Sequence, residues 1–292
     1  MHSNATFSAR GKEFMSYKRI LTVQDISCVG QCSLTVALPI LSACGMETAI
    51  LPSAVLSTHT GGFKGYTFCD LTDEMPKILA HWQKEGIRFA ALYTGYLGSS
   101  RQIDYVCQIK DTVLAEGAPL IVDPAMADNG KLYPGFDDAF VDSMKKLVAK
   151  SDIVLPNITE ACFLTGTEYR DSYDEAYIDL LFERLAALGV KNIVLTGVSY
   201  SPDSTGVAVY ESGKVHYYSH IRYEGGCHGT GDVYASAFTG ALMNGRSLFE
   251  SAKLAADYTL RCIEATALED NHWYGAAFEK ALPSLIKSLG LQ

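Results

Sequence analysis

This sequence has few of the features that assign a protein to a broad class at once. Basic residues are in the minority, because 24 Lys and Arg stand against 33 Asp and Glu, a formal net charge of −9. Without a basic excess to offset the phosphate backbone, we do not expect general nucleic-acid binding. No apolar run approaches the roughly 20 residues of a membrane-spanning helix. The polar first residues, 1–14, lack the apolar core of a signal peptide.

The cysteines lack the spacing of a metal or redox motif. Eight are present, and no two of them have the CxxC spacing typical of zinc sites and thiol-redox motifs. A chain of 292 residues is also too large to need a disulfide framework. We therefore expect reduced thiols and a cytoplasmic protein.

Two common phosphate-binding fingerprints are missing as well. The Gly-Lys pairs at 11–12, 130–131 and 213–214 are followed by Glu, Leu and Val. A P-loop would have Ser or Thr there. A dinucleotide-binding fingerprint would follow the first strand, but Gln24-Asp25-Ile26-Ser27 stands in that place.

What the chain does have is an alternation of short apolar runs with helical patterns. This alternation predicts an α/β fold with a mostly parallel central sheet and helices on both faces. Residues 1–16 are expected to be a disordered extension, and residues 17–292 to form one domain. We expect strands near 19–23, 48–51, 89–93, 120–122, 152–155 and 193–195, an antiparallel hairpin at 205–210 and 215–220, and helices near 32–44, 71–85, 99–116, 173–188, 231–243, 248–267 and 276–289.

A glycine-rich stretch at 225–231 opens directly into a helical pattern, with Asp232 at the junction. Glycines leave room for a ligand near the backbone, and a helix N-terminus adds free N–H groups and the positive end of its dipole. That combination favours an anion such as phosphate. Asp232 is placed to take a proton from an attacking hydroxyl, which indicates phosphoryl transfer to an alcohol. The alternative is a structural turn capped by Thr230 or Asp232.

Polar side chains follow four of the expected strands, where ligands of open α/β sheets bind. They stand at 24–27, 57–62, 123–128 and 156–160. Asp123, Asp128 and Glu160 supply carboxylates that suit a Mg²⁺ bound with nucleotide phosphates, because magnesium prefers oxygen ligands. The alternative is local: Asp123 ends a strand, and Asn157 caps a helix, with Glu160 completing a capping box.

Two histidines and a tyrosine are weaker candidates. His59 and His228 are more simply explained as structural histidines, and neither is needed as a base while Asp232 is present. Tyr96 either lies at the end of a strand for structural reasons or faces a flat ring.

These motifs resemble the ribokinase superfamily and, within it, the pyridoxal kinases. Gly229-Thr230-Gly231-Asp232 is similar to the superfamily's anion-hole and catalytic motif. The segments at 20–25 with Gly30, and at 57–61, 94–98, 123–124 and 152–157, resemble pyridoxal kinase segments in the same order. The resemblance extends from about Tyr17 to the C-terminus, and it implies a three-layer sandwich with a small lid element.

The resemblance implies an ATP-dependent kinase of pyridoxal, pyridoxine or pyridoxamine. Asp232 would be the general base, and the N–H groups of Gly229, Thr230 and Gly231 would hold the transferred phosphate. Family members commonly form dimers and often need a monovalent cation.

The remaining candidate residues receive their roles from the same resemblance. Asp123, Asp128 and Glu160 would lie near Mg²⁺ and the ATP phosphates, mostly through water. Asn157, Thr196 and Gly197 would line the nucleotide site. Asp25, Thr60 and Tyr96 would lie at the pyridine ring, with His59 close by. The segment after Gly61 would be part of a mobile cover.

Two positions depart from the pyridoxal kinase pattern. Asp25 stands where these kinases usually have a Ser next to the ring. Cys227-His228 precedes the glycine motif, where a Thr-His pair is typical of hydroxymethylpyrimidine kinases, although those kinases often have Cys in place of Asp232. A hydroxymethylpyrimidine kinase of the same fold is therefore the main alternative. A vitamin-binding protein without turnover is a further one.

Overall fold

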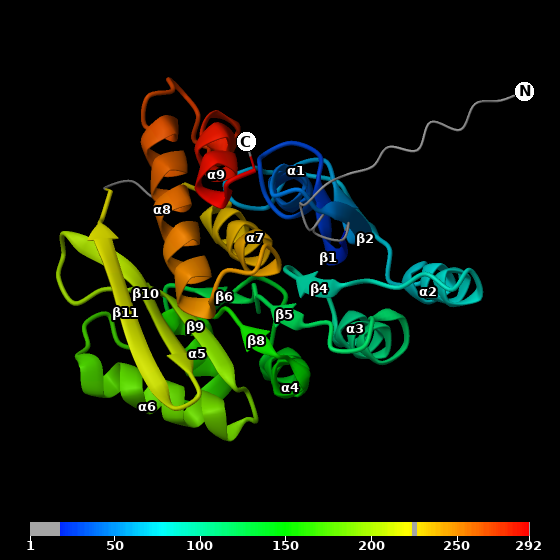
Figure 1. Cartoon of the computed structure of the whole chain (residues 1–292), viewed down its shortest axis with the longest axis horizontal. Coiled ribbons are helices and arrows are strands. Elements are labelled where there is room, and N and C mark those ends of the chain that lie inside the picture. The colour runs from blue at the N-terminus through cyan, green and yellow to red at the C-terminus, as the bar shows by residue number, and fades with distance from the viewer. Residues whose placement is uncertain (1–17, 224–226, 292) are drawn as a thin grey trace, which may run out of the picture.

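A nine-stranded sheet forms the centre of the computed structural model, which describes residues 18–223 and 227–291 (Figure 1). The expected extension at 1–16, and Gly225 and Gly226 of the glycine-rich stretch, lie outside the described residues. The strands are β1 (Arg19–Ser27), β2 (Glu47–Leu56), β3 (Phe68–Asp70), β4 (Ala91–Thr94), β5 (Leu120–Val122), β8 (Ile153–Val154), β9 (Asn192–Val198), β10 (Ser204–Glu211) and β11 (Lys214–Ile221).

The sheet is parallel in its middle and antiparallel at both edges. Its order is β11-β10-β9-β8-β5-β4-β1-β2-β3. The strands from β9 to β2 pair in parallel, whereas β3, β10 and β11 pair antiparallel with their neighbours. A separate two-stranded hairpin, β6 (Ala127–Asp128) and β7 (Lys131–Leu132), follows β5. The predicted hairpin after residue 196 is confirmed and closes one edge.

Helices cover both faces of this sheet (Figure 1). One layer holds α1 (Leu34–Ala43), α7 (Thr230–Met243), α8 (Leu248–Thr266) and α9 (Leu282–Leu289). The other holds α2 (Met75–Lys84), α3 (Ser100–Val113), α4 (Asp138–Lys150), α5 (Ile158–Thr165) and α6 (Glu175–Ala187). Successive strand residues point to opposite layers, so Ile20 packs in the first core and Leu21 in the second. The predicted α/β class with helices on both faces is confirmed.

Three details differ from the sequence-based expectation. Strand β1 runs on to Ser27, past an irregularity in its pairing with β2 between Gln24 and Ile26. Strand β3, helix α4 and the hairpin β6–β7 were not among the expected elements, and α5 was expected only in the alternative in which Asn157 caps a helix. The last helix begins only at Leu282, after a short 3₁₀ turn at Phe278–Lys280. Pro283 explains that start, because proline lacks the N–H that a helix interior needs and is accepted in the first turn.

All eight cysteines are free, as expected. In the two described stretches, no helix is long and apolar enough to cross a membrane.

Candidate active site

Asp232 lies in the first turn of α7 and contacts a residue 199 positions away in the sequence. Its Oδ2 accepts a hydrogen bond of 2.9 Å from the backbone N–H of Ser33, in the loop between β1 and α1. The carboxyl is partly exposed but has protein packed densely around it, and this burial raises its pKa to about 7. The charge of Asp25 contributes to the rise, and the Ser33 N–H opposes it. A carboxylate with a pKa near 7 is suited to general-base chemistry at neutral pH.

The turn before Asp232 has the geometry of an anion-binding loop. Gly229 is the N-cap of α7, with a φ of +77°, and a Cβ there would lie 2.2 Å from the carbonyl oxygen of Gln31. Only glycine fits this position without strain or a clash. Gly231 is exposed in the first helical turn, and a Cβ there would meet open space. Among the described residues no side chain caps α7, so the first N–H groups of this 14-residue helix lie beside Asp232 without a side-chain partner.

Asp25 lies inside β1, where its carboxyl is 5% exposed. Its Oδ2 accepts a hydrogen bond of 3.0 Å from the Ser27 hydroxyl. Burial raises the pKa of Asp25. The charge of Asp25 also raises the pKa values of Asp232 and Tyr96, although burial is the main cause in both. Asp25 is therefore close to both the predicted base and the predicted ring-facing tyrosine.

The other predicted substrate residues lie on loops. Tyr96 follows β4 and stacks on Phe136, with ring centroids 5.6 Å apart. Thr60 is exposed in the loop after β2. The structure thus brings Tyr96 near Asp25, and it places Thr60 beside His59.

Both ring nitrogens of His59 are hydrogen-bonded to backbone groups. Its Nδ1 accepts a hydrogen bond from the N–H of Gly61 at 3.0 Å, and its Nε2 lies 2.7 Å from the carbonyl oxygen of Tyr274, to which it donates. Burial lowers the pKa of His59. Both ring nitrogens are therefore engaged in the fold, as the structural interpretation of this histidine anticipated. His228 is exposed, with its ring 5.1 Å from that of His59.

The three predicted nucleotide residues lie together at the ends of β8 and β9. Asn157 and Thr196 form an isolated bridge, and the Thr196 N–H donates to the Pro156 carbonyl at 2.9 Å. Gly197 follows, exposed, with a φ of +73°. The three residues therefore lie close together, and their role at a nucleotide stays a prediction.

Asn157 and Glu160 also form the capping box of α5. The Asn157 side chain accepts from the Glu160 N–H, and Glu160 Oε2 accepts from the Asn157 N–H, each at 2.9 Å. Glu160 Oε1 accepts from the N–H of Met126, also at 2.9 Å. The local alternative is therefore present, and it ties α5 to the loop that carries Asp123.

The three predicted metal carboxylates do not gather into one cluster. Within residues 18–223 and 227–291, no group of three His, Cys, Asp or Glu side chains is arranged to hold a metal ion. Asp128 is exposed and accepts from its neighbour Asn129, and both Glu160 oxygens accept backbone N–H groups. Glu160 thus serves as part of the α5 capping box, and the expectation that these carboxylates lie near Mg²⁺, mostly through water, stays a prediction.

The charges near Asp123 nevertheless suit a hydrated cation. Burial raises the pKa of Asp123 well above its usual value, and the charges of Glu160 and Asp232 add to the effect. Burial also raises the pKa of Glu160 to about 7. The ion pairs among the described residues include none of these carboxyls. A cation held mainly through water would relieve this repulsion, so the residues fit Mg²⁺ in that form.

An aromatic cluster, formed by Phe63, Trp273 and Tyr274, was not anticipated from the sequence. The rings of Phe63 and Trp273 lie 4.7 Å apart, and Phe63 lies 5.0 Å from His59. Trp273 remains 52% exposed. Gly62 allows this contact, because a Cβ there would lie 2.7 Å from the Trp273 ring. The signal available in the sequence was the rarity of tryptophan, because the chain contains only two.

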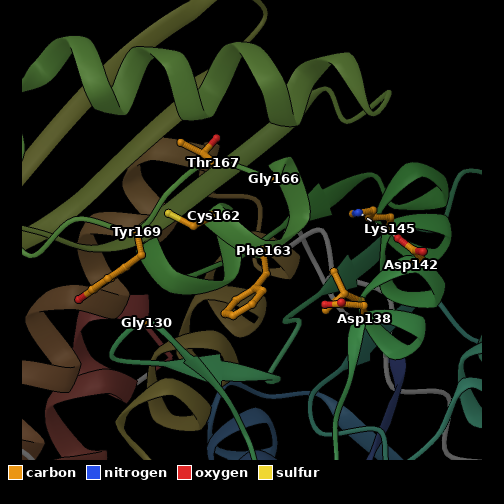
Figure 2. A pocket seen from close by; sticks show the side chains of 10 residues that line it. Gly130, Asp138, Asp142, Lys145, Cys162, Phe163, Gly166, Thr167 and Tyr169 are labelled. Carbon is orange, nitrogen blue, oxygen red and sulfur yellow. Dashed lines mark hydrogen bonds and ion pairs between the residues drawn. The ribbon is translucent and has the colours of Figure 1, made fainter.

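A second concave feature lies away from these residues. A cavity of about 450 Å³ opens between α4, α5 and the turn of the β6–β7 hairpin (Figure 2). Lys145 and Asp142 form an ion pair at its rim, and Phe163 reaches into it (Figure 2). None of the described residues that line it is a predicted site residue.

Comparison with known proteins assigns the chain to a family. The family model described as phosphomethylpyrimidine kinase matches residues 41–277. The chain belongs to the phosphomethylpyrimidine kinase family. This membership confirms the resemblance to the ribokinase superfamily, and it makes the vitamin-binding protein without turnover the poorer explanation.

Individual members of the phosphomethylpyrimidine kinase family and its relatives are similar over nearly the whole chain. A Bacteroides thetaiotaomicron protein named for these kinases, in a crystal form with pyridoxal, is 38% identical with a TM-score of 0.86, covering 92% of this chain and 96% of its own. Pyridoxal kinase from Lactobacillus plantarum is 32% identical with a TM-score of 0.86, covering 94% and 98%. A pyridoxine/pyridoxal/pyridoxamine kinase of Bordetella avium is 27% identical, covering 93% and 92%.

Proposed function

We propose that this protein transfers the γ-phosphate of ATP to the hydroxymethyl group of pyridoxal, pyridoxine or pyridoxamine. The observation that carries the proposal is the pairing of Asp232, whose pKa is about 7, with the open N-terminus of α7. The similarity to two B6-vitamer kinases and to a protein crystallised with pyridoxal supports this choice of substrate.

The reaction follows from the positions of these groups. Asp232 accepts the proton of the hydroxymethyl group as its oxygen forms a bond to the γ-phosphorus. The bond between that phosphorus and the β–γ bridging oxygen breaks, and ADP leaves with the electron pair. The N–H groups of Gly229, Thr230 and Gly231 stabilise the charge on the transferred phosphoryl group. Positioning and charge stabilisation supply most of the rate enhancement.

The partners of the reaction are part of the same proposal. Asn157, Thr196 and Gly197 line the nucleotide site, and Asp25, His59, Thr60 and Tyr96 line the vitamin site. Asp123, Asp128 and Glu160 hold Mg²⁺ through water, where the bound ion would neutralise charge on the phosphates. We also propose a monovalent cation, a homodimer and a cytoplasmic location. The eight free thiols support the last of these.

A hydroxymethylpyrimidine kinase is the second candidate. The description of the matching family favours it, as does Asp25, a hydrogen-bond acceptor for a polar ring. Asp232 in the base position favours the B6 vitamers over the pyrimidine.

A substrate panel tests the proposal. The purified protein is incubated with ATP, Mg²⁺ and each of four alcohols: pyridoxal, pyridoxine, pyridoxamine and hydroxymethylpyrimidine. ADP release is followed in a coupled assay, and the phosphorylated product by mass. We expect the highest kcat/KM with a B6 vitamer. A clear preference for hydroxymethylpyrimidine would replace the first candidate by the second, and no turnover with any of the four would refute both.

Replacing Asp25 by Ser is expected to change substrate ranking rather than catalysis. The buried carboxyl can accept a hydrogen bond from the heterocycle, and its raised pKa makes that ability depend on pH. The ranking of the four alcohols by kcat/KM should change, while the KM for ATP stays near the wild-type value. Asp104→Ser, at an exposed position of α3, is the control. An unchanged ranking at two pH values would show that Asp25 does not face the ring.

A further inference from the structure

The loop between β1 and α1 is strained where it meets the catalytic carboxyl. Gln31 and Ser33 have φ angles of +39° and +56°, in the left-handed region that residues other than glycine seldom adopt. Such a conformation costs of order 1–3 kcal/mol and persists only where the surroundings enforce it. Ser33 is the residue whose N–H donates to Asp232. Something must therefore hold this loop in place.

The side chain of Gln31 is held by the segment that follows α8. Its Nε2 donates to both carboxylate oxygens of Glu279, each at 2.9 Å. Its Oε1 lies 2.7 Å from Nε2 of His272, which donates to it. Gly275 provides the space, because a Cβ there would lie 2.6 Å from the Gln31 Cβ. Three points of one segment thus fix one side chain, and we call Gln31, His272 and Glu279 the Gln31 clasp.

The backbone of Gln31 is pressed against the glycine turn at the same time. A Cβ on residue 229 would lie only 2.2 Å from the Gln31 carbonyl oxygen, so only a glycine at 229 allows this approach. Gln31 therefore connects three parts of the chain: the β1–α1 loop, the turn that begins α7, and the segment from His272 to Glu279. None of its own atoms needs to touch the substrate to affect the site.

We propose that Gln31 is a positioning residue for phosphoryl transfer: its clasp by His272 and Glu279 holds the Ser33 N–H against the carboxylate of Asp232. The proposal rests on the proposed function for the role of Asp232 as the base. A purely structural role of Gln31 would affect folding alone. A positioning role also changes the proton affinity of the base, because the Ser33 N–H favours the ionised carboxylate.

Several other titratable groups lie close to Asp232. The charge of Asp25 of β1 raises the pKa of Asp232, and the charge of Asp232 in turn raises the pKa values of Asp123, Cys32, Tyr93 and Tyr133. The burial of Asp232 and the charge of Asp25 on β1 therefore keep its pKa raised without the clasp. Loss of the Ser33 hydrogen bond can therefore only raise it further.

The test is the pH dependence of kcat/KM in Gln31→Ala and Glu279→Ala. We expect a lower kcat in both and an acid limb displaced upward by about one pH unit, the size of a lost hydrogen bond to a charged group. Gln108→Ala, an exposed position of α3, should match the wild type. The double variant Gln31→Glu/Glu279→Gln, which exchanges donor and acceptor, should restore the wild-type profile. A reduced kcat with an unmoved acid limb, or wild-type values in Gln31→Ala, would overturn the proposal.

A second measurement works even if the protein transfers no phosphate. The difference in stability between the wild type and Asp232→Asn should change as pH rises above the unfolded pKa of Asp232 and level off near its folded pKa. The pH at which it levels off should rise when both are compared in the Gln31→Ala background. If that pH is the same in both backgrounds, Gln31 does not position Asp232. Failure of the substrate panel with that pH displaced would refute the proposed function and leave the clasp intact.

Discussion

Asp232→Asn is expected to slow phosphate transfer by on the order of 10²–10⁴, the usual loss for a general base. The amide is nearly the same size as the carboxylate and can still accept the hydrogen bond from the Ser33 N–H. It cannot take up the proton of the attacking hydroxyl. Steady-state kcat with the best alcohol of the panel measures the effect. Activity within about fivefold of the wild type, far below that range, would remove Asp232 from the role of base.

The same substitution should stabilise the fold at alkaline pH. Asp232 has a pKa of about 7 in the folded protein, against an ordinary value of 3.8. The folded state therefore holds its proton more tightly, and stability falls as pH rises between these values. Above pH 7 the wild type bears the full cost of the buried charge, whereas Asn does not. Thermal melts at pH 5 and pH 8 should show the gain of Asp232→Asn at the higher pH, which also separates lost catalysis from lost folding.

The second large effect is expected when Gly229 or Gly231 of the anion-binding turn is replaced by Val. The two variants should lose activity for different reasons. Gly229→Val combines a φ of +77° with a contact of 2.2 Å to the Gln31 carbonyl oxygen. The turn must move, so we expect a melting temperature lower by several degrees and loss of turnover. Gly231→Val has open space and no strained φ, so the protein should fold. Its side chain would stand in front of the helix N–H groups and raise the KM for ATP by roughly 10- to 100-fold.

The pair is judged by melting curves and ATP titrations on the same preparations. Gly245→Val serves as the control for a valine at a glycine of positive φ, since that position also has open space but follows α7 at its far end. Normal turnover in Gly231→Val would show that phosphate does not bind at this helix N-terminus. A fully stable Gly229→Val would contradict the packing described for Gln31.

The layers of the fold could be predicted because most strands and most helices are marked by local patterns in the sequence. Apolar runs marked β5 and β9, alternation marked the hairpin of β10 and β11, and glycines marked the ends of helices. The predicted end of β1 was wrong because tertiary packing outweighed the local polarity of the sequence. Asp25 and Ser27 are polar, yet they continue β1 because each is buried. Helix α4, with its Asp137 cap, went unassigned although its amphipathic pattern was visible.

The site was predictable only in part for a related reason. Asp232 and its glycines lie in one continuous motif, so their chemistry could be predicted from the sequence. Glu160 has the same residue type whether it binds a metal or caps a helix, and only the Met126 and Asn157 contacts distinguish the two. The Gln31 clasp joins residues 241 and 248 positions apart, and no local pattern marks such a contact.

The hydrogen bond between Ser33 and Asp232, 199 positions apart, also sets an order for assembly. At about 5–20 residues per second of synthesis, the two ends of this bond are made roughly 10–40 s apart. During that interval the nascent chain contains the β1–α1 loop without the helix or the C-terminal segment that hold it in its strained shape. The loop must therefore adopt its native conformation late, and the capacity to bind phosphate arises only once nearly the whole chain has been released from the ribosome.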